Sequence, residues 1–119
     1  MKITIAIFLL FLGCIFKNMY SYGYGVNDAF WRVVWSIDEG TIWAQNFSEE
    51  NFSKLTKGMT SEEVLSLMGK PLNMSENCED ICFWNYTKQD SGTSDFDQRW
   101  VVFNRDHQVV EIRKSFFID

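Results

Sequence analysis

The side chains with the most reactive chemistry in this sequence are one histidine and three cysteines. A histidine can act as a general acid or base, and thiols can bind metal, carry acyl groups or form disulfides. His107 stands next to Asp106 in a segment predicted to be an exposed turn, without the nucleophile and orienting acid of a catalytic set. No phosphate-binding glycine loop and no zinc-ligand spacing occurs in the sequence. The sequence therefore predicts no catalytic residues, no metal and no cofactor.

Cys14 lies inside an apolar N-terminal segment that is typical of an export signal. The apolar run from Ile3 to Phe16 is about fourteen residues long, short of the roughly twenty that a spanning helix requires. Ser21-Tyr22-Gly23 is a small-residue cleavage pattern that would release a chain starting near Tyr24. Phe11-Leu12-Gly13-Cys14 resembles a bacterial lipobox, in which Cys14 would be acylated and become the first mature residue. Both outcomes stay open from the sequence, and an uncleaved anchor is the third.

Cys78 and Cys82 form a candidate disulfide, because an exported chain matures in an oxidising compartment. The closed ring would be small, so its effect on the entropy of the unfolded chain would also be small. The alternative interpretation is two free thiols, one of them buried in a strand.

Composition and charge place the chain among small globular proteins. The 119 residues are 46% hydrophobic and 17% aromatic, which suits one domain with a core. The net charge of −5 and the lack of Lys/Arg runs argue against a nucleic-acid partner. We expect an export signal at 1–23, an aromatic-rich segment at 24–47 and a folded domain at 48–119.

The aromatic-rich segment allows two interpretations. Its residues can form or cover a core, which is the usual place of Trp and Phe, or they can form a partner-binding surface. Base rates favour the core. Part of the segment could be extended, with Asp38-Glu39-Gly40 as a turn. The candidate partner-binding residues are Trp31, Trp35, Ile37 and Trp43.

Two short capped helices are predicted in the middle of the chain. Ser48 can cap the first helix, which Gly58 can end. Thr60 can cap the second in a capping box with Glu63, and Gly69 can end it. Helices of this length are not stable alone, so their apolar faces must dock on another element.

Three strands are predicted after these helices, at 80–87, 99–104 and 108–117, because apolar and polar residues alternate there. A polar loop at 88–98 separates the first two strands, and a tight turn at 104–107 separates the last two. One apolar sheet face and two amphipathic helices can bury each other. The predicted fold is α+β: two short helices packed on a three-stranded antiparallel sheet (α-α-β-β-β) in two layers.

The order of these elements and the residues within them resemble the SmpA/OmlA/BamE family of small bacterial envelope lipoproteins, over roughly 47–112. The helical half of the motif is the more specific one. The chain departs from the family pattern at His107, where the turn usually carries Gly, and in having Cys78 and Cys82. The residues that carry the resemblance are Phe52, Leu55, Gly58-Met59-Thr60, Glu63-Val64, Leu67, Gly69, Pro71, Trp84, Tyr86, Val101-Val102-Phe103, Val110 and Ile112.

The resemblance implies export, attachment to the outer membrane through a lipidated cysteine, and no catalysis. The expected function is that of a non-enzymatic accessory domain that binds and stabilises, in outer-membrane protein assembly or envelope integrity. Its partner would be another envelope protein or a lipid surface, and its place the periplasm or the outer membrane. The alternative is a secreted soluble binding or inhibitor module of the same fold. Four Asn-x-Ser/Thr matches would indicate a secreted glycoprotein only in a eukaryotic source: Asn46, Asn51, Asn73 and Asn85.

Overall fold

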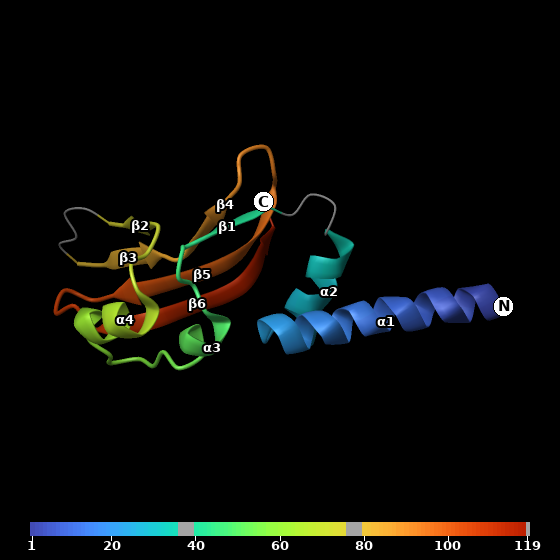
Figure 1. The fold of residues 1–119 in the computed structure, drawn as a ribbon, viewed down its shortest axis with the longest axis horizontal. Helices are drawn as coiled ribbons and strands as arrows, with labels where there is room; N and C mark the ends of the chain where they lie inside the picture. Colours follow the sequence, from blue (N-terminus) through green and yellow to red (C-terminus); the bar gives the residue numbers. More distant parts are fainter. Residues whose placement is uncertain (36–39, 76–79, 119) are drawn as a thin grey trace.

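A long N-terminal helix projects from a mixed helix and sheet domain (Figure 1). The structure is a computed structural model that describes residues 1–35, 40–75 and 80–118. The molecule measures 59 × 29 × 23 Å. Helix α1 (Lys2–Tyr22) forms much of the long dimension, and Gly23 ends it with a left-handed φ of 65°. By length and composition alone α1 could cross a membrane, a test that signal sequences also pass.

The main sheet is antiparallel and has four strands, in the order β2-β3-β5-β6. Strands β3 (Cys82–Asn85), β5 (Asp95–Phe103) and β6 (Val109–Ile118) correspond to the three predicted strands. A short edge strand, β2 (Asn73–Met74), pairs with β3. The α+β class is confirmed, and the sheet has one strand more than predicted.

A second, two-stranded sheet pairs β1 (Thr41–Trp43) with β4 (Thr87–Gln89). β4 lies partly in the predicted polar loop, and β5 begins at Asp95 and not at Arg99. The loop prediction was therefore too long at both ends. The polar start of β5 is a strand because its partner β6 continues beside it, with Asp95 opposite Ile118.

The two predicted helices both form. Helix α4 (Ser61–Met68) has the predicted capping box, in which the Glu63 N–H donates to the Thr60 hydroxyl over 3.2 Å. Helix α3 (Glu49–Phe52) is capped by Ser48 as predicted but has a single turn. It ends early because the following chain pairs with β6, where the Gly58 N–H donates to the Val109 carbonyl at 2.8 Å.

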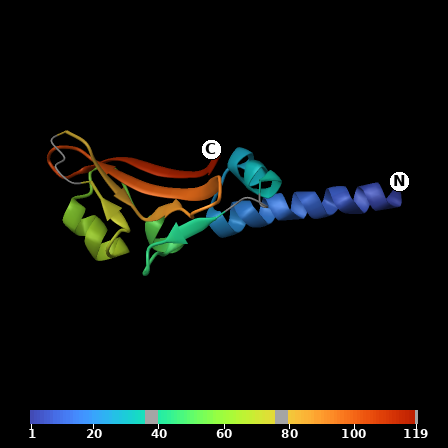
Figure 2. The same cartoon turned by 90° about the horizontal axis from the view of Figure 1, so that it is seen from above.

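Helices α3 and α4 cover one face of the main sheet (Figure 2). Both contribute fully buried side chains, such as Phe52 and Val64, to a core that also takes Val101 and Phe103 from β5. The predicted two-layer packing of helices on a sheet is present in this half of the molecule.

Residues 26–34 form helix α2 (Val26–Val34), so this part of the aromatic-rich segment is not extended. No side chain caps its N-terminus, where Gly25 stands. The helix is instead held by packing, because it contacts both α1 and β6. The predicted turn at 38–40 lies mostly outside the described residues.

Candidate functional site

The C-terminal half of α1 and helix α2 meet strands β5 and β6 at one place, which we call the junction. An apolar cluster forms one side of it, and a network of buried charges forms the other. Ala29 of α2 is fully buried at its centre. The apolar members are Phe11, Ile15, Met19, Tyr22, Tyr24, Ala29, Phe30, Val33 and Phe116.

Asp97 of β5 is the acidic centre of the junction, with no exposed surface. Arg32 of α2 holds both carboxylate oxygens, with Nε at 3.0 Å from Oδ1 and Nη2 at 3.2 Å from Oδ2. The Tyr24 hydroxyl donates a hydrogen bond to Oδ1, and the Thr41 hydroxyl lies 3.4 Å from Oδ2. A buried carboxylate needs such partners, since an unpaired charge in the interior is very costly.

Arg99, two residues further on the same face of β5, is the basic centre and is also fully buried. Its Nη2 lies 2.6 Å from Glu49 Oε1, and its Nη1 donates to the Tyr24 hydroxyl at 2.8 Å. Burial is the largest influence on the pKa of Arg99 and lowers it, but the hydrogen bonds and charge interactions with Glu49 and Tyr24 together outweigh burial and raise the pKa overall. Burial also raises the pKa of Tyr24, which therefore stays protonated between the two centres.

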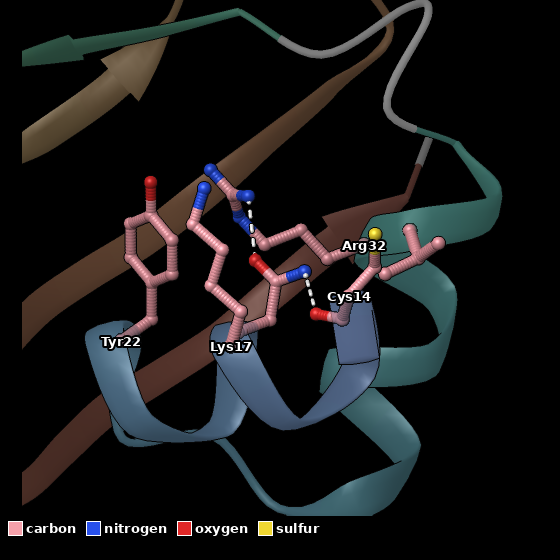
Figure 3. Close-up of a pocket in the computed structure, with 6 residues that line it drawn as sticks. Cys14, Lys17, Tyr22 and Arg32 are labelled. Atoms are coloured by element: carbon pink, nitrogen blue, oxygen red, sulfur yellow. Dashed lines mark hydrogen bonds between the residues drawn. The ribbon is translucent and has the colours of Figure 1, made fainter. Parts of the chain in front are cut away.

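Asn18 of α1 extends this network to the N-terminal helix. Its Oδ1 accepts from Arg32 Nη1 at 2.8 Å, and its Nδ2 donates to the Cys14 carbonyl at 3.0 Å. The Arg32 guanidinium lies 3.8 Å from the centre of the Tyr22 ring. Figure 3 shows these side chains around a cleft of about 190 Å³, which Lys17 also lines.

The junction has the chemistry of a structural connection. Both oxygens of Asp97 and all three guanidinium nitrogens of Arg99 have hydrogen-bond partners, and most of these partners come from other segments of the chain, so the two groups tie those segments together. Within the described ranges, no group of three His, Cys, Asp or Glu side chains could hold a metal ion.

The predicted partner-binding residues separate into two groups. Trp31 and Trp35 lie on α2 and directly after it, with 39% and 44% of their surface exposed. Trp43 on β1 is half-buried, 4.8 Å from the Phe47 ring, and lines an open hollow of about 440 Å³. Ile37 lies outside the described residues.

Among the residues that the structure describes, Cys14, Cys82 and His107 lie on separate elements of the fold. Cys14 is exposed on α1, and Cys82 is buried at the start of β3. Cys78 lies outside the described residues, so its disulfide with Cys82 stays a prediction. His107 is exposed in the turn before β6 with a φ of 58°, a left-handed conformation that explains why glycine suits this position.

Sequence reasoning missed the charged centres of the junction, because residues 95–98 were assigned to a loop. One signal was available. Asp95, Asp97 and Arg99 alternate in phase with Val101 and Phe103, so a strand through all five places the charges on the core-facing side. Charged side chains are almost never fully buried unless they are paired. Charges on the core-facing side of a strand therefore indicate that another element packs there and supplies the pairing groups.

The fold and the junction define a small α+β domain that is carried directly on an apolar N-terminal helix. A family model described as the outer membrane protein assembly factor BamE domain matches residues 45–113. This is more than half of the chain, and the protein belongs to the BamE domain family. The match includes Glu49, Asp97 and Arg99 of the junction, whereas α1, α2 and β1 lie before it. The comparison with curated proteins finds no match.

Proposed function

We propose that this protein is a membrane-anchored, non-enzymatic accessory factor in the assembly of outer-membrane proteins. The family match over residues 45–113 carries the proposal, because it connects the folded domain to assembly factors. The apolar helix α1 is consistent with export to the envelope. Cys14, exposed on that helix, is sterically free to carry an acyl group.

The exposed aromatic face of α2 is the proposed partner surface. Ala29 and Val33 face the junction, while Trp31, Val34 and Trp35 leave about two fifths of their surface exposed. Tryptophans that are held by a rigid helix and remain accessible are typical anchors of protein interfaces. We propose another envelope protein as the partner of this face.

Deletion and complementation in the native host test the function. Loss of the gene should lower the amount of folded β-barrel proteins in the outer membrane, and the wild-type chain should restore it. A double substitution, Trp31→Ala with Trp35→Ala, should restore much less. The matched control is Leu65→Ala, which truncates an equally exposed apolar side chain on α4. Normal barrel levels in the deletion strain would refute the assembly role.

A further inference from the structure

We infer that the mature protein keeps residues 15–24 and uses them to dock the sheet rigidly onto its anchor, with no flexible tether between them. The inference concerns which residues remain after export. It therefore holds or fails independently of the assembly role proposed above.

The apolar side of the junction depends on the end of α1. Ile15, Met19 and Tyr22 recur at helical spacing on one face of α1 and pack in one cluster with Ala29 and Phe116. Ile15 is 7% exposed, although its neighbour Phe16 is 64% exposed. A leader that is removed after export would not need one helix face whose side chains pack against the folded domain. The selective burial indicates that this face belongs to the domain.

The polar side gives an independent reason. Asn18 interrupts the apolar character of α1, is 8% exposed and accepts from Arg32 at 2.8 Å. Arg32 in turn holds Asp97, which has no exposed surface. Without Asn18 and the Tyr22 ring, the Arg32 guanidinium would lose the hydrogen bond of 2.8 Å and the ring contact that α1 supplies. The leader residues thus complete the shell around a buried ion pair of the domain.

The possible processing events differ in what they leave of the junction. Cleavage after Gly23 would remove Ile15, Asn18 and Tyr22 together. Cleavage before an acylated Cys14 would remove only Phe11 from the apolar cluster. An uncleaved anchor would keep all members of the cluster. Cys14 lies eight helical residues before Tyr22, about 12 Å along the axis, and α2 begins at Val26. A chain anchored at or before Cys14 therefore holds the sheet close to the membrane surface.

Intact mass tests the inference directly. The full chain is expressed in a Gram-negative host, extracted from membranes and measured without further processing. An uncleaved N-terminus, or a first residue at an acylated Cys14, supports the inference. Any later first residue, such as Tyr24, overturns it.

A pair of substitutions in the full chain tests the docking itself. Ile15→Ala should lower the melting temperature of the detergent-solubilised protein by about 5 °C or more, because it empties a buried position. Phe16→Ala is the matched control on the exposed side of the same turn and should have little effect. Equal melting temperatures for Ile15→Ala and the wild type would overturn the inference. Normal barrel assembly in a deletion strain would refute the proposed function and leave both of these results untouched.

Discussion

Replacing Asp97 by Asn is the sharpest test of the junction, because it removes one charge and almost no volume. Asp97 is fully buried and holds Arg32 through two contacts of 3.0 and 3.2 Å. Removing one member of a buried ion pair costs about 3–5 kcal/mol of unfolding free energy. The Arg32 side chain retains 13% exposure and asparagine keeps one acceptor, which points to the lower end, about 3 kcal/mol.

Thermal unfolding of the full chain in detergent, followed by circular dichroism, measures this loss. Each kcal/mol lowers the melting temperature of a chain of this size by about 4 °C, so Asp97→Asn should lower it by about 12 °C. The control is Asp80→Asn, which breaks the ion pair between Asp80 and Arg105. Their charged atoms are only 2.6 Å apart, but both side chains are about three quarters exposed. Solvent screening makes such a pair weak, and we expect no measurable change.

Comparing the losses of stability in Arg32→Gln, Asp97→Asn and the double variant gives a second test of the ion pair. Arg32→Gln leaves the fully buried Asp97 without its countercharge and should destabilise the protein at least as much as Asp97→Asn. The double variant should lose less than the two single losses combined, since both remove the same interaction. The reasoning is refuted if Asp97→Asn unfolds at the temperature of Asp80→Asn, or if the two junction substitutions are additive.

Three further predictions concern the domain itself. Thr60→Ala removes the acceptor for the Glu63 N–H and should lower the unfolding free energy by about 1 kcal/mol, seen as a lower urea midpoint with an unchanged slope; an unchanged midpoint would contradict the capping role. His107→Gly should raise the melting temperature, because glycine relieves a left-handed φ of 58° that costs other residues about 1 kcal/mol; a lower melting temperature would count against this account of the turn. Alkylation of the exported protein, denatured but not reduced, should leave Cys78 and Cys82 unmodified, and mass spectrometry that finds both alkylated would rule out the predicted disulfide.

The sequence alone determined the elements whose signals are local. A capping box involves residues three apart, so Thr60 and Glu63 fix the start of α4 wherever the segment lies. The same holds for the Ser48 cap of α3. The family resemblance followed from these elements, because its most specific residues lie in α4 and in the turns that flank it.

Only the tertiary structure decided the length of α3, the start of β5 and the state of residues 26–34. α3 stops after one turn because residues 58–59 pair with β6, a partner about fifty positions away. Residues 95–98 look like a loop because they are polar, and they form a strand because β6 lies beside them. α2 has no side-chain cap and depends on its contacts with α1 and β6.

The junction was hidden for the same physical reason. The charges of Asp97 and Arg99 can be buried only when Arg32, Tyr24 and Glu49 arrive from three other segments, and that neutralisation depends on distances that no sequence pattern contains. A sequence records which side chains can cap a turn or face a sheet. Which distant charges meet, and therefore which residues of α1 contact the sheet, is settled only when the chain is packed.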